Sequence, residues 1–258
     1  SLKLNLWRSE NINLDEALKG ELVAQKLDVI IVIDFGQKVK EPFLSIPKFG
    51  CINLHPSLLP KYRGAAPIQR ALMDGQKETG VTVFKLTELM DAGPILAQEE
   101  VPIDIDDTAG TLSKKLLSAG VDLLVTALNL LVAGTAKFKE QDESTATYAP
   151  KITNEEAFFD FDKKATEIHN KVRALNPKPG AYTIVNNRRL KVWRTKLINE
   201  EETLSTPRTI LGIDEGFPVI ACGKGAVSLR EVQWEGKATI DGRSFINGLR
   251  LHEGDVLP

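Results

Sequence analysis

The sequence predicts an α/β protein in two parts: a Rossmann-like, mostly parallel sheet, followed by a small OB-like β-barrel. Two observations support this division. Apolar β-branched runs alternate with helical stretches through the first half of the 258-residue chain, a pattern typical of a doubly wound sheet. Beyond residue 180, five short runs of alternating polarity are separated by turn residues, which indicates a small barrel.

The first half is expected to open with a helix over residues 14–26, because Asn13 is a suitable N-cap. Residues 28–33, DVIIVI, form a continuous β-branched run typical of a strand buried on both faces. The next apolar run, GCINL, predicts a second strand that ends at His55. Ligands of doubly wound sheets gather beyond the carboxyl ends of the strands, so the chain around His55 is a candidate site.

Three segments follow from the change in pattern along the chain. Residues 1–134 hold the alternating strands and helices and form the first domain. Residues 135–153 are polar and aperiodic, which indicates a linker. Residues 154–258 hold one helix and then the five predicted strands, AYTIV, RLKVWRTKL, RTILGI, FPVIAC and AVSLREVQW.

Composition excludes several classes of protein. Hydrophobic residues make up 42% and charged residues 26%, which is ordinary for a globular protein with a sizeable core. Cys51 and Cys222 lie far apart, so neither a disulfide framework nor a zinc site is expected. The three histidines, His55, His169 and His252, offer no ligand set, and we expect no metal. No apolar run approaches the roughly 18 residues of a membrane span, so no membrane partner is expected.

A local basic cluster lies in the second part of the chain. The formal net charge is only −2, which gives no overall preference for nucleic acid. Five basic residues nevertheless gather in NNRRLKVWRTK: Arg188, Arg189, Lys191, Arg194 and Lys196. They predict either a surface that touches a polyanion or a solvated strand face, and composition does not decide between the two.

The stretch INLHPSLLPKYRGAAP, residues 52–67, carries the first candidate site residues. Asn53 and His55 are two apart on the predicted strand and therefore project from the same face. An amide can steady an oxyanion and an imidazole can move a proton near neutral pH. Asp91 follows in LMDAGPIL, on a turn between two predicted strands. Taken singly, these residues would be a capping Asn, a core His and a turn Asp.

Their combination resembles a known family. N-x-H-P-S-L-L-P, followed thirty-odd residues later by D-A-G-P-I, resembles the formyltransferases that use 10-formyltetrahydrofolate. Within that family, SLLPKYRGAAPIQRALMDGQKETGVTV is most similar to the members that formylate initiator methionyl-tRNA. TYAPKI (147–152), VRALNPKPGAYT (172–183) and FINGLR (245–250) resemble the connector and second domain of those members.

The resemblance implies a transferase with 10-formyltetrahydrofolate as formyl donor and initiator methionyl-tRNA as acceptor, without a metal. Asn53, His55 and Asp91 would be its catalytic residues. Asp91 would either orient the imidazole or hold a water, and the sequence leaves both roles open. The residues lining the tetrahydrofolate would be Ser57, Leu58, Leu59 and Pro60. Residues 154–258 would help hold the tRNA.

The resemblance also starts part-way into the family's sequence. It implies that a strand, a Gly-containing loop and further strand–helix units precede residue 1, and that DVIIVI would otherwise form an exposed sheet edge. Asp34 stands where the family suggests a small or apolar residue. A monomer is expected, in the bacterial cytoplasm, or in the mitochondrial matrix if a transit peptide precedes these residues.

Three alternatives stay open at this point. A formyltransferase with a small acceptor, such as glycinamide ribonucleotide, would use the same trio and the same SLLP loop, although it needs no second domain. A hydrolase would release formate from 10-formyltetrahydrofolate to water. A protein that binds tRNA or folate without turnover would not need all three catalytic residue types.

Overall fold

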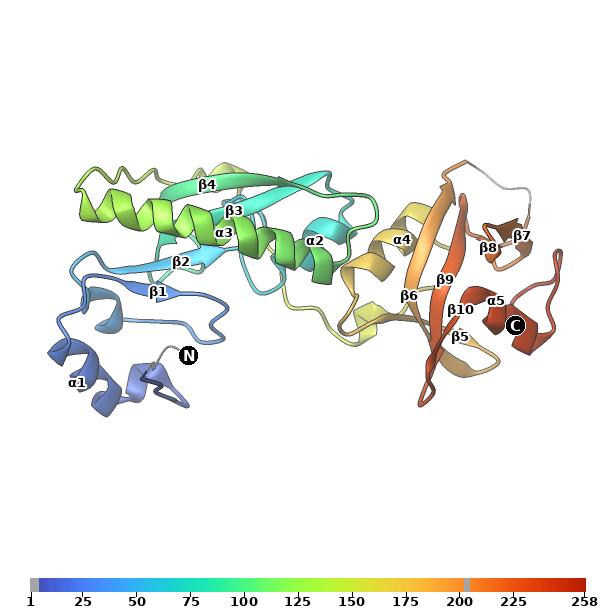
Figure 1. The fold of residues 1–258 in the computed structure, drawn as a ribbon, viewed down its shortest axis with the longest axis horizontal. Coiled ribbons are helices and arrows are strands. Elements are labelled where there is room, and N and C mark those ends of the chain that lie inside the picture. The colour runs from blue at the N-terminus through green and yellow to red at the C-terminus, as the bar shows by residue number, and fades with distance from the viewer. Residues whose placement is uncertain (1–4, 202–204) are drawn as a thin grey trace. The chain divides into compact units, whose positions relative to one another are not determined.

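A computed structural model of the chain describes residues 5–201 and 205–258 (Figure 1). The chain forms two compact units, each assembled from segments that are separated in the sequence. Unit 1 consists of Ser1–Pro67, Glu78–Pro102 and Lys115–Ala149. Unit 2 consists of Ile68–Lys77, Ile103–Lys114 and Pro150–Pro258.

Unit 1 is built on a four-stranded sheet in the order β1-β2-β3-β4. The strands are β1 (Ile30–Val32), β2 (Cys51–His55), β3 (Glu78–Lys85) and β4 (Ile95–Pro102). Strand β1 pairs with β2 in parallel, whereas β2 with β3 and β3 with β4 are antiparallel. The prediction of a mostly parallel sheet is therefore wrong, and the sheet is mixed. The link from β3 to β4 is too short for the crossover that a parallel pair requires.

The prediction that residues 28–33 form a strand buried on both faces is also wrong. Strand β1 lies at the edge of the sheet and covers three residues, with Ile31 exposed between half-buried neighbours. Ile33 and Phe35 just beyond it are exposed as well, so the expectation of an open edge is confirmed. Asp34 adopts a φ of 47° at this turn, a left-handed conformation that Asp tolerates better than most residues.

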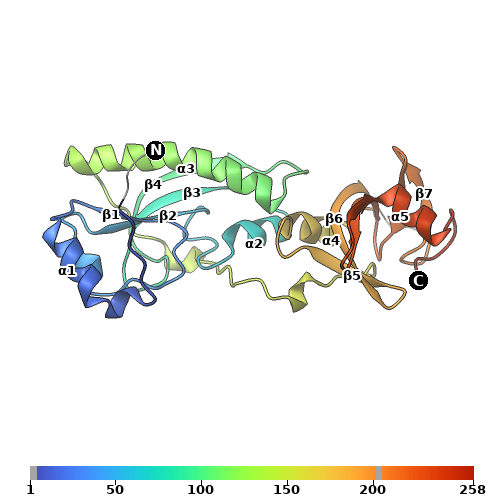
Figure 2. The same cartoon turned by 60° about the horizontal axis from the view of Figure 1, so that its bottom comes forward.

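Helices cover both faces of this sheet. In Figure 2, α3 (Ala109–Val132) lies on one side of the strands and α1 (Glu16–Ala24) on the other. The N-cap of α1 is Asp15, whose carboxylate accepts from Leu18 N at 2.9 Å. The predicted cap, Asn13, instead bonds through its amide to the backbone around residue 38. The single-turn 3₁₀ helices of this unit are η1 (Ile12–Leu14), η2 (Phe43–Ser45) and η3 (Glu143–Thr145).

Helix α3 has one buried face and one exposed face. By length and composition it could cross a membrane, with a mean hydropathy of 1.7 over its most apolar 18 residues, contrary to the expectation above. One face is nevertheless buried, where Gly120 approaches Leu54 of β2 so closely that a Cβ would lie 2.8 Å from its Cδ2. Asp122 is exposed on the opposite side. This pattern is typical of a helix packed on a sheet.

Unit 2 contains an antiparallel sheet in the order β5-β6-β9-β8-β7, with β10 beside β9. Its strands are β5 (Ala181–Val185), β6 (Arg188–Asn199), β7 (Ile210–Asp214), β8 (Phe217–Ala221), β9 (Ala226–Trp234) and β10 (Thr239–Asp241). The five predicted strands are confirmed as β5 to β9, and β10 was not predicted. Among the described residues no pairing joins β5 to β7, so closure into a barrel stays a prediction.

The helices of unit 2 bury apolar side chains against this sheet. They are α2 (Pro67–Met73), η4 (Glu155–Ala157), α4 (Ala165–Ala174) and α5 (Gly242–Leu249). Helix α2 starts at Pro67; Pro is favoured at a helix start because its missing N–H needs no partner there. From α4, Ile168 and Val172 enter a cluster with Leu190 and Val192 of β6.

Candidate functional site

Strand β2 carries two of the predicted site residues. Asn53 pairs with Val32 of β1 and Phe84 of β3, and His55 pairs with Thr82. Asn53 is half-buried, and its side-chain amide makes no hydrogen bond to any other described residue. Within the described part of the chain it is therefore a donor without a partner, two residues from the imidazole and on the same face of the strand.

The imidazole of His55 is buried, with 6% of the residue exposed. Its Nε2 lies 3.0 Å from the carbonyl oxygen of Tyr62. A carbonyl only accepts, so Nε2 carries the proton and the neutral ring leaves a lone pair on Nδ1. Burial lowers the pKa of His55, and the nearby carboxylate of Asp91 and the Tyr62 carbonyl partly offset this effect. The histidine is therefore a neutral group with its acceptor atom at Nδ1.

The turn between β3 and β4 brings Asp91 to this atom. Asp91 Oδ2 lies 3.7 Å from His55 Nδ1, beyond hydrogen-bond distance. The same oxygen accepts from Gly64 N at 2.8 Å. Both Asp91 and Gly64 have positive φ, 50° and 120°. The structure thus places two of the three predicted catalytic residues, His55 and Asp91, close to each other.

The four residues predicted to line the folate do not all face outward. Ser57 is fully buried and donates to Lys61 O at 2.6 Å. Leu59 is 3% exposed and packs in a core cluster with Phe84. Leu58 and Pro60 are only half-buried, so their side chains are the ones available to a ligand.

Two residues that hydrogen-bond around these site residues escaped the sequence analysis, Arg63 and Gln141. Arg63 is 2% exposed although it is charged, and its guanidinium bonds to Gln141 and Glu143. Gln141 lies in the segment predicted to be a linker. The burial of Arg63 follows from tertiary contacts and is not visible in the sequence, although a buried charge always needs fixed partners.

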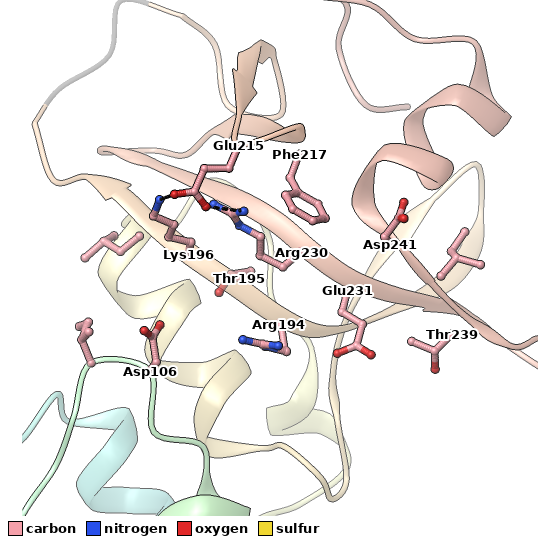
Figure 3. Close-up of a pocket in the computed structure, with 13 residues that line it drawn as sticks. Asp106, Arg194, Thr195, Lys196, Glu215, Phe217, Arg230, Glu231, Thr239 and Asp241 are labelled. Atoms are coloured by element: carbon pink, nitrogen blue, oxygen red, sulfur yellow. Dashed lines mark hydrogen bonds and ion pairs between the residues drawn. The ribbon is translucent and has the colours of Figure 1, made fainter.

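Unit 2 holds a separate cavity of about 760 Å³, shown in Figure 3. Its walls come from β6, β9, β10, the β7–β8 hairpin and the loop at Ile105, and none of the catalytic candidates lines it. Lys196 and Arg230 form ion pairs with Glu215 inside it. Arg194 points into the space and makes no ion pair with any described residue. This cavity combines both signs of charge.

The predicted basic cluster alternates with aromatic rings on β5, β6 and β9. Arg189 lies 4.0 Å from the ring centre of Tyr182, and Lys191 lies 5.1 Å from that of Trp193. Arg188 lies similarly over Trp234. Cations held over rings form a surface suited to phosphates and bases. Elsewhere, no group of three or more His, Cys, Asp or Glu within the described ranges could hold a metal ion.

Comparison with known proteins identifies the family. A model described as "Formyl transferase" matches residues 3–128, and one described as "Formyl transferase, C-terminal domain" matches residues 151–250. The chain is 41% identical to the methionyl-tRNA formyltransferase of Kosmotoga olearia over 250 residues, which are 96% of this chain and 80% of that protein. The chain belongs to the methionyl-tRNA formyltransferase family.

Further members support the assignment. The methionyl-tRNA formyltransferase of Bacillus subtilis is 39% identical over 249 residues, 96% of this chain and 78% of that protein. Among solved structures, HypX from Aquifex aeolicus in complex with tetrahydrofolic acid matches with a TM-score of 0.68 and 20% identity, over 91% of this chain and 42% of that one. That structure supports the fold. It also shows that a protein with this fold holds a folate.

Proposed function

We propose that this chain transfers the formyl group of 10-formyltetrahydrofolate to the α-amino group of initiator methionyl-tRNA. The pair of His55 Nδ1 and Asp91 Oδ2, 3.7 Å apart, carries the proposal, together with the nearby Asn53 amide, which bonds to none of the residues that the structure describes. The relatives that share most of this chain are bacterial methionyl-tRNA formyltransferases, so we place the reaction in the bacterial cytoplasm.

His55 acts through Nδ1. The amine must be neutral to attack the formyl carbon, and an α-amino group has a pKa of about 7.7–8.0, so part of it is ready near neutral pH. Attack creates an ammonium and an oxyanion. Because Nε2 is engaged by the Tyr62 carbonyl, Nδ1 takes the proton from the amine and returns it to the departing folate nitrogen.

Asp91 stabilises the charged form of this intermediate. Once Nδ1 is protonated it becomes a donor, and the Asp91 carboxylate faces it. The sequence left two roles open for Asp91, orienting the imidazole or holding a water. Because Tyr62 already fixes the ring's orientation at Nε2, we favour a different role, in which Asp91 supplies negative charge opposite the imidazolium. Its own position is held by Gly64 N–H.

Asn53 donates to the oxyanion. Its amide has no partner among the described residues, so it needs no internal bond to break before it meets the formyl oxygen. Removal of one such donor typically costs about 2.7–4 kcal/mol of transition-state stabilisation. Leu58 and Pro60 offer apolar surface to the folate from the same loop, while Ser57 and Leu59 support the loop from within.

The second domain, residues 154–258, would hold the tRNA, with residues 135–153 as the connecting segment. The ring-stacked cations Arg189 and Lys191 support this part of the proposal. Lys196 contributes less charge than the sequence suggested, because it is paired with Asp214 and Glu215. We expect a monomeric enzyme with an OB-like domain.

The test measures tetrahydrofolate release from 10-formyltetrahydrofolate with initiator methionyl-tRNA, glycinamide ribonucleotide or water as acceptor. We expect release that depends on the charged tRNA and is lost in His55→Ala. The matched control is His252→Ala, because the His252 side chain is 84% exposed. Release with the small acceptor or with water alone would indicate the small-acceptor transferase or the hydrolase, and folate binding without release would indicate a binding protein.

A further inference from the structure

Residues 139–149, here called the strap, are bonded along their length to the site. At one end the strap pairs with the start of β4, where Ile95 N donates to Lys139 O and Lys139 N to Ile95 O, both at 2.8 Å. At the other end Arg63 N donates to Thr147 O at 2.9 Å. Tyr62 N, next to the carbonyl that holds His55, donates to Thr147 Oγ1 at 2.8 Å. The strap therefore contacts both the loop and the acidic turn of unit 1.

Gln141 lies at the centre of these contacts. Its Nε2 donates to Asp91 O at 2.8 Å and to Gly93 O at 2.7 Å. Its Oε1 accepts from Arg63 Nε at 3.1 Å and from Nη2 at 2.8 Å. Only this orientation of the amide fits, because a flipped amide would set oxygen against two carbonyls and N–H against a guanidinium. All four bonds act on groups that surround the site.

Arg63 fixes Gln141 in turn. Its guanidinium is bidentate to Glu143, at 2.9 and 2.7 Å, and this pairing raises the pKa of Arg63. Arg63 is 2% exposed, so its rotamer is set by packing as well as by charge. A planar guanidinium held by two partners is a rigid anchor.

The acidic turn has little freedom while these bonds persist. Gly93 sits so close to β3 that a Cβ would lie 1.8 Å from Lys85 O, and its own carbonyl is held by Gln141. Asp91 is bound at its backbone by Gln141 and at its carboxylate by Gly64. The distance from Asp91 to His55 is thus set from the strap.

We propose that Gln141 is a positioning residue for formyl transfer, holding the turn Asp91–Gly93 so that the carboxylate faces Nδ1 of His55. The inference rests on the proposed function, because it assigns Gln141 a part in that reaction. It makes the segment predicted as a linker part of the active-site support. Displacement of a reacting group by about 1 Å can cost about a hundredfold in rate.

The test compares two substitutions of Gln141 with a control substitution of the neighbouring residue Glu140. Gln141→Met keeps the length of the side chain and adds no charge, but removes all four bonds. Gln141→Glu retains an acceptor for Arg63 and removes only the two donors to Asp91 and Gly93. Glu140→Gln is the control, because Glu140 is exposed and makes no side-chain hydrogen bond or ion pair with a described residue.

We expect kcat to fall about ten- to hundredfold in both Gln141 variants, with little change in KM for folate or tRNA, and no change in Glu140→Gln. The second readout is the titration of the His55 imidazole by NMR in Gln141→Met. We expect it to titrate at lower pH than in the unmodified chain, because a carboxylate that has moved away no longer favours the imidazolium. A merely structural glutamine would lower thermal stability without moving this titration.

The proposal is overturned if Gln141→Met is folded by circular dichroism and both kcat and the His55 titration match the unmodified chain. If Gln141→Met fails to fold, the kcat of Gln141→Glu tests the proposal instead, and an unchanged kcat in that variant overturns it. The NMR readout needs no turnover. Failure of the proposed function, seen as absence of tRNA-dependent release by the unmodified chain, is therefore distinguishable from failure of the assignment of Gln141.

Discussion

Gly80→Ala tests whether the SLLP loop is shaped by its packing against β3. A Cβ on Gly80 would lie 2.2 Å from Glu99 O and 2.4 Å from Leu58 Cδ2. Real Cβ atoms essentially never come closer than 3.0 Å, so the added methyl group must displace a backbone carbonyl of β4 or the Leu58 side chain. The carbonyl would have to move by about 0.8 Å, from 2.2 to 3.0 Å.

Such overpacking typically costs about 1–3 kcal/mol of the free energy of unfolding. For a chain of this size we expect a fall in Tm of roughly 2–4 °C for each kcal/mol. Displacement of Leu58 should also weaken folate binding, and a loss of about 1 kcal/mol corresponds to a Kd roughly fivefold higher. Thermal denaturation followed by circular dichroism and calorimetric titration with tetrahydrofolate measure the two effects.

The matched control is Gly20→Ala in α1, where nothing lies within 4 Å of an added Cβ. In a helix interior, alanine is more stable than glycine by roughly 0.5–1 kcal/mol. Tm should therefore stay equal or rise, and folate binding should not change. If Gly80→Ala matched the unmodified chain in both Tm and Kd, the packing of Leu58 over Gly80 would not be what shapes the loop.

Three further outcomes are expected. Burial lowers the pKa of both His55 and His169, so the unfolded chain protonates two histidines that stay neutral in the folded chain. The free energy of unfolding should therefore decrease as pH falls below about 6.5, by up to about 1.4 kcal/mol per pH unit for each histidine, and His55→Gln should reduce this slope in urea titrations without abolishing it. Burial raises the pKa of Cys51 to about 11 and of Cys222 to about 12, so a thiol reagent at pH 8 should label both only in urea; labelling of the native chain would contradict the burial. Arg189→Ala should raise the Kd for tRNA and reduce the slope of log K against log salt by about 0.7–0.9, measured by filter binding from low to moderate salt. An unchanged slope would show that Arg189 does not contact the tRNA phosphates.

The sequence alone determined where most of the strands of unit 2 lie. The five strands β5 to β9 of unit 2 followed from alternation and turn residues, because both signals are local. Asn53, His55 and Asp91 were named from short motifs, and the motifs also carried the family. Local patterns of this kind report on residue type and spacing, which is what chemistry at a strand end requires.

Only the tertiary structure decided how these elements pair and which atoms do the work. A β-branched run looks the same whether its strand has one neighbour or two, so β1 was misjudged, and the sheet proved mixed. The tautomer of His55 depends on the carbonyl of Tyr62, and the inward turn of Ser57 and Leu59 depends on β3. Gln141, fifty residues after Asp91, reaches that turn only through long-range contacts, which no local pattern encodes.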